Sequence, residues 1–487
     1  MLWWIRLVAG PVFAGIVYAA LWHYGLPHGA CLMACLLIWM GWWWMSEPVH
    51  LAVTSLLPFV VIPFTGAMKT EEVAMQYMDP IIFLFMGGFF IAYALEKWGL
   101  HQRMAHFLIR KAGNRPSRVL LGVMLSAYVL SMWVSNTATV MMLLAAVLAV
   151  VKQEALYEAR SHRQIASAML IGLSFSATIG GMATPVGTPP NMIFAGFYAR
   201  QFPDARPVDF LQWMKLGVPF SLAMLVLCYG ILRGMFIPQR VDKPFDLRML
   251  DEQLSVRSPM RYEEKAVAII FLMTAALWVF RDTFQIGKLS IPGWTSLFGH
   301  YGAQIKDSTV AIGSALLLFM LPAKNRPGRL LEWSDTKELP LGIILLFGAG
   351  FALAAGMERT GVSALLAQKL TALKGADTFF ILLGIAATVT LMSEFASNTA
   401  TVQLVLPVII PLSASLGITP LPLMLTATFA ASLGYMLPVA TAANTIVYGS
   451  GYIKVSAMMR AGALLDVLGI LLLTFAMHTL GKYIYYF

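Results

Sequence analysis

The chain has 487 residues, of which 59% are hydrophobic and only 12% are charged. Soluble globular proteins carry about a quarter charged residues, so this composition, with a mean hydropathy of +0.74, excludes them and indicates an integral membrane protein. The formal net charge is +10, but the basic residues fall in the connections between apolar segments. We therefore expect a bilayer around the protein and no nucleic-acid partner.

Apolar runs close to the length of a membrane-spanning helix recur along the whole chain. They include residues 266–280 and 463–480 with their flanks. Because the runs are continuous and do not alternate with polar residues, they predict helices and not barrel strands. The expected fold is an all-α polytopic membrane protein with about 11 transmembrane helices.

Basic residues mark the connections that we expect on the cytoplasmic side. Two connections carry Arg240, Lys243, Arg248, Arg257, Arg261, Arg326 and Arg329. The turn 21–27 has no lysine or arginine, so the positive-inside rule places it outside. This alternation predicts a cytoplasmic N-terminus, and we expect the bacterial inner membrane as the location.

A polar hexapeptide occurs twice in this apolar sequence. Ser135–Val140 returns unchanged as Ser397–Val402, 262 residues later. The same offset aligns Phe85, Gly88, Phe89, Ala92, Glu96, Gly99 and Ser131 with Phe347, Gly350, Phe351, Ala354, Glu358, Gly361 and Ser393. A constant offset over such a stretch indicates an internal duplication.

The two copies differ in the charge that flanks them. Residues 97–118 carry six lysines and arginines, whereas the equivalent stretch 359–374 carries three. We expect the first stretch inside and the second outside, so the copies are inverted repeats. Secondary transporters built from inverted repeats bind their substrate near the bilayer midplane, between the repeats.

Each hexapeptide interrupts an apolar segment near its middle. A re-entrant hairpin over 116–150, and another over 378–411, places the Ser-Asn-Thr triplet at a tip where non-helical backbone can line a cavity. Such a tip exposes the positive end of a helix dipole, which suits an anion. It also exposes amide and hydroxyl oxygens, which suit a hard cation.

A second interruption follows each hairpin. Three prolines and a glycine, found between Pro185 and Pro190, break a helix over 165–199 because they remove backbone hydrogen bonds. At an offset of 253, residues 438–444 interrupt the helix 421–452, but there Ala442 and Ala443 replace the proline pair. The second break is thus less strongly predicted than the first.

The repeats divide the chain into five parts. We expect scaffold helices in 1–80, the first repeat core in 81–199, scaffold helices and cytoplasmic loops in 200–338, the second repeat core in 339–452 and the last transmembrane helix in 453–487.

The four polar elements contain no lysine, arginine or histidine. None occurs in 131–142, 174–198, 389–406 or 432–453. An anion bound there would be met by helix ends, amides, hydroxyls and a co-bound cation. Coupling to sodium would offset part of an otherwise costly buried charge.

These motifs resemble the divalent anion/sodium symporter family. The resemblance rests on the paired Ser-Asn-Thr triplets, the lead-in Ser393-Glu394-Phe395 and the breaks at 187–191 and 438–447, and it covers about residues 30–480. It implies a sodium-coupled secondary active transporter that imports small divalent anions by an elevator-type alternating-access mechanism, as a homodimer. It implies neither an enzyme nor an organic cofactor.

The resemblance also implies two sodium sites that flank one substrate site. The sodium ions would be held by Ser131, Ser135, Asn136, Gly187, Ser393, Ala396, Asn398 and Ala440. The carboxylates of the substrate would meet Ser135, Asn136, Thr137, Thr188, Ser397, Asn398, Thr399 and Thr441. The chain departs from the family at Ser393, where threonine is common, and at Ala442 and Ala443, where prolines are usual.

Several functions stay open at this point. We expect C4-dicarboxylates such as succinate, malate or fumarate as cargo, with sulfate or citrate as alternatives. A sodium-independent dicarboxylate exchanger and an ion channel are the competing modes. Glu394 is an acid at membrane depth, and two kinds of role stay open for it. The functional role is a proton or cation site, and the structural role is a salt bridge or an exposed position at the hairpin base.

Overall fold

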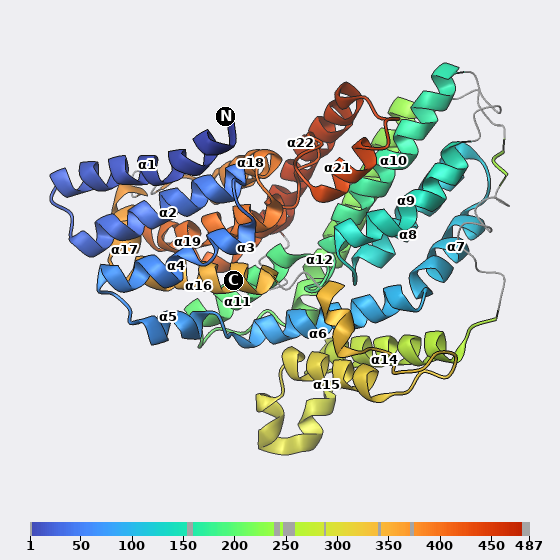
Figure 1. The fold of residues 1–487 in the computed structure, drawn as a ribbon, viewed down its shortest axis with the longest axis horizontal. Coiled ribbons are helices and arrows are strands. Elements are labelled where there is room, and N and C mark those ends of the chain that lie inside the picture. The colour runs from blue at the N-terminus through green and yellow to red at the C-terminus, as the bar shows by residue number, and fades with distance from the viewer. Residues whose placement is uncertain are drawn as a thin grey trace.

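The computed structural model of the protein describes residues 2–152, 159–237, 244–246, 259–286, 289–338, 342–370 and 375–479. Arg240, Lys243, Arg248 and Arg257, on which the expected topology partly depends, lie outside these ranges, as do the final residues of the expected last helix. Almost every element is a helix (Figure 1). Two short strands, β1 (Phe284–Ile286) and β2 (Leu289–Ile291), pair antiparallel in one connection.

Nine helices within the described ranges have the length and apolar composition to cross a membrane. They are α1 (Leu2–His23), α2 (His28–Ser46), α6 (Pro80–Lys97), α10 (Ala159–Gly181), α12 (Phe210–Phe236), α16 (Gly342–Arg359), α18 (Thr378–Phe395), α19 (Asn398–Leu416) and α22 (Val455–Thr479). The all-α membrane fold is confirmed, and the expected number of spans stays a prediction.

The remaining helices, all of which except α14 are shorter than those nine, complete the fold. They are α3 (Leu51–Thr54), α4 (Leu57–Val61), the 3-10 helix η1 (Ile62–Thr65), α5 (Thr70–Gln76), α7 (Leu100–Ala112), α8 (Pro116–Ser131), α9 (Asn136–Val151), α11 (Pro189–Gln201), α14 (Tyr262–Val279), η3 (Trp294–Gln304), α15 (Asp307–Met320), η4 (Trp333–Glu338), α17 (Val362–Leu370), α20 (Pro420–Ala430) and α21 (Ala442–Tyr448).

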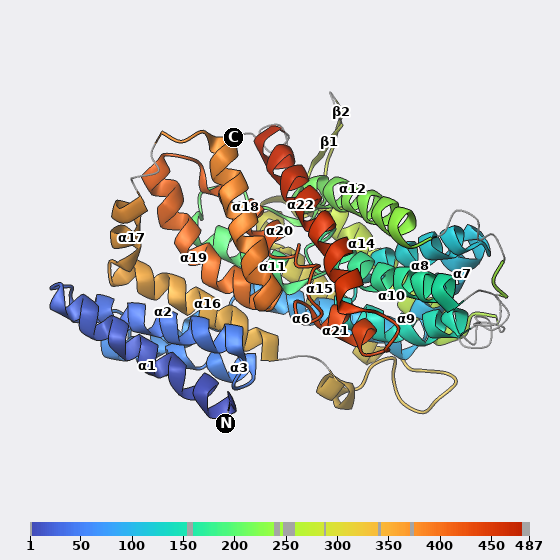
Figure 2. The same cartoon turned by 90° about the horizontal axis from the view of Figure 1, so that it is seen from above.

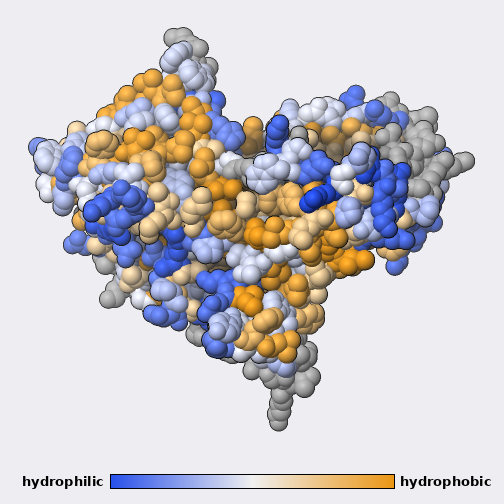
Figure 3. All heavy atoms as spheres, turned by 60° about the horizontal axis from the view of Figure 1, so that its bottom comes forward, coloured by the Kyte–Doolittle hydropathy of each residue, from blue (hydrophilic) through white to orange (hydrophobic). Residues whose placement is uncertain are grey.

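The outer surface carries the apolar side chains that a bilayer requires. On α1, which lies at the edge of the molecule against α2 (Figure 2), Trp4 is 63% exposed and Ile16 is 59% exposed. Figure 3 shows broad apolar areas on one face, interrupted by polar clusters. Covering such areas with lipid is favourable, whereas exposing them to water would be costly.

Helix α10 forms the centre of the bundle and positions the site. It packs against α8, α9, α12 and α21, and its apolar side chains are almost completely buried. The approach to α8 is close because residue 180 is glycine: a Cβ there would lie 2.8 Å from the Cα of Tyr128. The pairs α8–α9 and α18–α19 lie toward opposite ends of the molecule (Figures 1 and 2).

Candidate functional site

The first Ser-Asn-Thr triplet lies at the turn between α8 and α9. Ser135 is the N-cap of α9, and its Oγ accepts a hydrogen bond from the Ala138 N–H at 3.3 Å. This cap is favourable because the first N–H groups of a helix have no partner within the helix. Ser131 Oγ donates to Asn136 Oδ1 at 2.8 Å, which fixes the amide across the turn.

The first break brings more oxygen atoms to the same turn. Residues 182–188 are not helical, and Thr184 Oγ1 donates a short hydrogen bond to the Met132 carbonyl. A Cβ on Gly187 would lie 2.5 Å from the Gly181 carbonyl oxygen and 2.9 Å from that of Ser131. Only glycine fits there, so carbonyl and amide oxygens can surround a small cation without a side chain in the way.

The second triplet repeats this arrangement between α18 and α19. Ser397 is the N-cap of α19, and its Oγ accepts from the Ala400 N–H at 3.2 Å. Ser393 Oγ lies 3.0 Å from Asn398 Oδ1 and 2.5 Å from the Ala431 carbonyl oxygen, and these two acceptors share its one proton. Two of the residues expected at the second sodium site, Ser393 and Asn398, therefore lie in contact as Ser131 and Asn136 do in the first.

The second break is longer than the first and is held differently. Residues 431–441 separate α20 from α21, and the Asn444 side-chain amide donates to the Leu437 carbonyl at 3.1 Å. Ser174 Oγ on α10 donates to Asn444 Oδ1 at 2.6 Å, which joins the two halves of the site. The position equivalent to Gly187 is Ala440, which is 1% exposed and already carries a Cβ.

The structure excludes both structural roles that the sequence left open for Glu394, a salt bridge and exposure at the hairpin base. It is 2% exposed, and it makes no ion pair within the described ranges, so it is neither a salt bridge nor an exposed acid. Its two carboxylate oxygens accept the backbone N–H groups of Met436 and Leu437, at 2.8 and 2.9 Å. Glu394 thus fastens the second hairpin to the second break.

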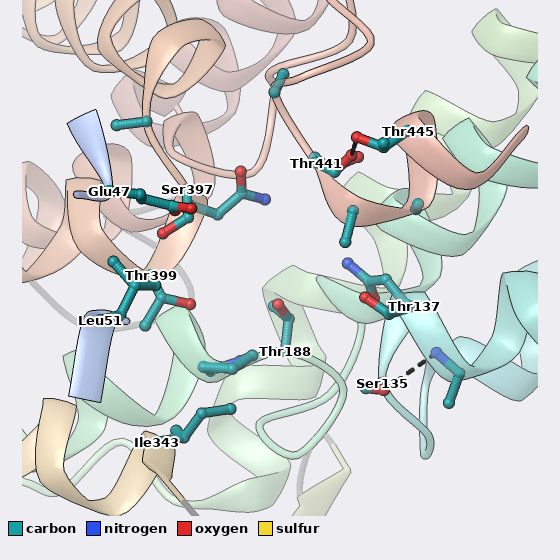
Figure 4. A pocket seen from close by; sticks show the side chains of 18 of the residues that line it. Glu47, Leu51, Ser135, Thr137, Thr188, Ile343, Ser397, Thr399, Thr441 and Thr445 are labelled. Carbon is teal, nitrogen blue, oxygen red and sulfur yellow. Dashed lines mark hydrogen bonds between the residues drawn. The ribbon is translucent and has the colours of Figure 1, made fainter. Parts of the chain in front are cut away.

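Both tips face one cavity of about 1300 Å³. All eight expected substrate residues line it: Ser135, Asn136, Thr137, Thr188, Ser397, Asn398, Thr399 and Thr441. In Figure 4 the labelled residues of the two tips point toward the space between them, with Thr188 and Thr441 beside it. Of the expected sodium residues, Ala396 and Ala440 reach the cavity, whereas Ser131, Gly187 and Ser393 lie behind the tips.

Charged residues from outside the motifs also line the cavity. Arg6 of α1, Glu47 at the end of α2 and Glu96 of α6 belong to its wall. The absence of a fixed cation therefore holds for the four polar motifs but not for the cavity as a whole. Glu96 could have been identified from the sequence, because the repeat offset aligns it with Glu358. Arg6 and Glu47 belong to no repeat or motif and are notable only for lying near helix ends.

The N-termini of three long helices open onto the same cavity, beside that of the short α21, which begins at Ala442. Helices α9, α11 and α19 begin at Asn136, Pro189 and Asn398, all of which line it. The N-termini of α9 and α19 carry about half a positive charge and free N–H groups, whereas α11 begins with two prolines and contributes its dipole alone. The arrangement can stabilise a small anion between two clusters of oxygen atoms, each able to hold a hard cation.

The cavity can be tested by thiol labelling. Val439 is 74% exposed in its wall, whereas Ala430 is fully buried in α20. In a variant with Cys31, Cys35 and Cys228 replaced, we expect Val439→Cys to react with a water-soluble maleimide in detergent and Ala430→Cys to stay unlabelled. Equal labelling of the two variants would contradict the cavity described above.

Known proteins resemble this chain over nearly its whole length. The family model described as the sodium:sulfate symporter transmembrane region matches residues 2–486. The sodium-dependent dicarboxylate transporter SdcS of Staphylococcus saprophyticus is 34% identical over 484 residues, covering 98% of this chain and 91% of the relative. SdcS of Staphylococcus aureus is 35% identical over 468 residues, covering 94% and 87%.

The fold is also similar to a solved structure. The crystal structure of the YdaH transporter of Alcanivorax borkumensis aligns with a TM-score of 0.53 at 16% identity, covering 84% of this chain and 87% of that one. At this identity the likeness concerns the fold alone. The family match over nearly the whole sequence decides the identity: the chain belongs to the sodium:sulfate symporter family, the divalent anion/sodium symporters that its motifs resemble.

Proposed function

We propose that this protein is a sodium-coupled secondary active transporter that imports C4-dicarboxylates such as succinate, malate or fumarate. The observation that carries the proposal is the convergence of both Ser-Asn-Thr tips on one cavity, each backed by its own cluster of oxygen atoms. The SdcS relatives, named as sodium-dependent dicarboxylate transporters, support the choice of ion and cargo.

In this proposal the first sodium ion binds behind the first tip. Ser131, Ser135, Asn136 and Gly187 supply side-chain and backbone oxygen atoms, and the close packing around Gly187 supports a site of small radius. The second ion binds behind the other tip, at Ser393, Ala396, Asn398 and Ala440. Both ions lie beside the substrate and offset its charge.

The dianion binds between the tips. One carboxylate meets Ser135, Asn136, Thr137 and Thr188, and the other meets Ser397, Asn398, Thr399 and Thr441. Hydroxyls, amides and helix N-termini are neutral or partly positive, so they hold the dianion firmly only while the sodium ions are present. This dependence is the physical basis of coupling.

An elevator-type movement fits the asymmetry of the two halves. In the second half, α19 packs on α16, and Gln403 Nε2 donates to the Leu346 carbonyl at 2.8 Å. Met141, the counterpart of Gln403, is instead 63% exposed in the cavity between α9 and α6. If Met141 became packed as Gln403 is now, and Gln403 became exposed as Met141 is now, the present cavity would close. An equivalent cavity would then open on the opposite side of the protein.

The contacts of Arg200 also support the proposal that the protein is closed on the side opposite the cavity. Arg200 at the end of α11 pairs with Asp79 at the start of α6 at 2.6 Å and lies over the ring of Phe351, 4.5 Å from its centre. Such contacts would break as α11 moves past the scaffold. We infer that this structure represents a state open toward the side of Arg6.

The remaining parts of the proposal concern topology and assembly. The helix pairs α8–α9 and α18–α19 are re-entrant hairpins of two inverted repeats, and the N-terminus is cytoplasmic in a bacterial inner membrane. These assignments draw on the charge distribution and the polar interruptions of the sequence. The homodimer follows from the family resemblance.

Uptake into proteoliposomes tests the function directly. We expect radiolabelled succinate to accumulate when sodium is added outside, because two bound cations offset the dianion, and not when choline replaces it. Unlabelled malate and fumarate should compete more strongly than sulfate and citrate. Equal uptake without sodium would refute symport, and stronger competition by sulfate would change the cargo.

Removing either tip amide tests the site. We expect Asn136→Ala and Asn398→Ala each to lower sodium-dependent uptake at least about tenfold, because a lost ligand to a charged group costs about 1.5–3 kcal/mol. Size-exclusion chromatography should show both variants to be folded. Near-normal uptake by either variant would mean that its tip holds neither ion nor substrate.

A reversible disulfide tests the movement. A Cβ on Gly350 would lie 2.6 Å from Gln403 Cδ, in space that a cysteine at position 403 would vacate, so we choose these two positions for the cysteine pair. We expect the oxidised Gly350→Cys, Gln403→Cys variant to bind substrate but not to transport it, and reductant to restore uptake. Full transport by the oxidised variant would exclude sliding between α16 and α19.

A further inference from the structure

One guanidinium group lies in the wall of the large cavity. Arg6 is the only basic residue among the described residues that line it, and its side chain is exposed. That side chain forms no ion pair and no hydrogen bond within the described ranges. The residues proposed to bind the substrate are uncharged and belong to the tips and the breaks, whereas Arg6 belongs to α1. A fixed cation outside the motifs therefore faces the space that a dianion must enter.

The backbone of Arg6 is held in place by two indole groups. Trp42 Nε1 of α2 donates to the Arg6 carbonyl at 2.9 Å, and Trp43 Nε1 donates to the Leu7 carbonyl at 3.0 Å. The two helices touch closely there, because a Cβ on Gly10 would lie 2.8 Å from Trp43 Cδ1. These contacts fix the start of the Arg6 side chain and leave its guanidinium available for a ligand.

The corner that ends α2 is also held in place. Glu47 has a φ of 44° and a ψ of 50°, and it is the only non-glycine residue with a positive φ among those that the structure describes. Such a backbone is unfavourable for a residue with a Cβ and occurs where neighbouring contacts hold it, often at ligand sites. Here Trp3 Nε1 of α1 donates to the carbonyl of the next residue, Pro48, at 2.7 Å. In Figure 4, Glu47 lies on the same side of the cavity as Ser397.

A topology signal alone does not explain this arrangement. The positive-inside rule requires a basic residue near the membrane surface, and not one whose backbone is tied to the wall of a cavity. Two acids, Glu47 and Glu96, line the same cavity, so its wall would repel a dianion if Arg6 were absent. A guanidinium also presents parallel N–H donors that match the two oxygen atoms of a carboxylate.

We propose that Arg6 is a capture residue, whose guanidinium binds a carboxylate of the dianion in the cavity before or after the substrate occupies the site between the tips. The identity of that dianion, a C4-dicarboxylate, rests on the proposed function. Arg6 acts in the present open state alone, because α1 and α2 stay with the scaffold in the proposed elevator movement while the tips leave them. The two sides of the membrane therefore offer the substrate different affinities.

The reactivity of a thiol in the cavity tests the charge of Arg6 without any cargo. In the cysteine-free background, Val439→Cys is treated with two methanethiosulfonates of opposite charge, the sulfonatoethyl anion and the trimethylammonium-ethyl cation. We expect Arg6→Gln to lower the ratio of the anionic to the cationic rate about threefold, the order expected for one unit charge acting through water across such a cavity. Arg6→Lys should preserve the ratio, and Glu47→Gln should raise it.

The controls separate a charge effect from a change of structure. Leu297→Cys, at a position that is 84% exposed on η3 and does not line the cavity, should show the same ratio in every variant. Salt at about 1 M should remove the differences at position 439, because it screens charges beyond about 3 Å. An unchanged ratio in Arg6→Gln, or a change of the same sign in Arg6→Gln and Glu47→Gln, would overturn the proposal.

Binding of succinate tests the capture of the substrate. In the oxidised Gly350→Cys, Gln403→Cys variant, which holds the present state, Arg6→Gln should weaken sodium-dependent binding about threefold to fivefold, and Glu47→Gln should strengthen it. In membrane vesicles of the two orientations, Arg6→Gln should raise the KM for succinate more on the side of Arg6 than on the other side.

Each outcome bears on a different part of the inference. Unchanged binding in Arg6→Gln would overturn the capture role, and an equal rise of the KM on both sides would overturn its restriction to one state. If the oxidised variant with Arg6 intact bound no succinate, the proposed cargo would be refuted. The thiol ratios would still decide whether Arg6 attracts anions into the cavity.

Discussion

Unwound backbone at membrane depth must find all of its hydrogen-bond partners within the protein, because lipid offers none. The two breaks of this chain meet that requirement in different ways. Asn191 serves the first with its side-chain amide, which donates to the carbonyl oxygens of Gly181 and Thr184 at 2.9 and 2.8 Å. The second break is held by the acids Glu394 and Asp466, which take its N–H groups. One break is thus held by an amide that donates to its carbonyl groups and the other by acids that accept from its N–H groups.

The two halves of the site are therefore related but not equivalent. Gly187 lies where carbonyl oxygens leave no space for a side chain, whereas the matching Ala440 carries one. The first interruption spans 182–188 and the second spans 431–441. Pro189 and Pro190 occupy the first positions of α11, where a missing N–H costs nothing, so prolines determine where the helix resumes and are not required for it to unwind.

Much of the site could be predicted because polar residues are rare in this sequence. The Ser-Asn-Thr triplets and the Thr188 and Thr441 positions are identifiable from a repeated offset, and all of them line one cavity. Arg6 and Glu47 were not predictable, because charged residues at helix ends serve first as topology signals and only folding brings these two to the cavity. Asp466 lies in the helix that follows the second repeat, so no internal alignment pointed to its hydrogen bond with the backbone of the second break.

The hydrogen bond from Ser174 to Asn444 has a consequence for how faithfully the transporter couples its substrates. It joins α10, which leads into the first break, to the helix that follows the second, and both side chains are fully buried. In the proposed mechanism, a rigid link of this kind would make the two ion sites parts of one body, so that neither would cross the membrane while the other remains behind. Slippage, in which one ion leaks without its companion, would require this body to come apart and leave two polar groups unpaired in an apolar interior.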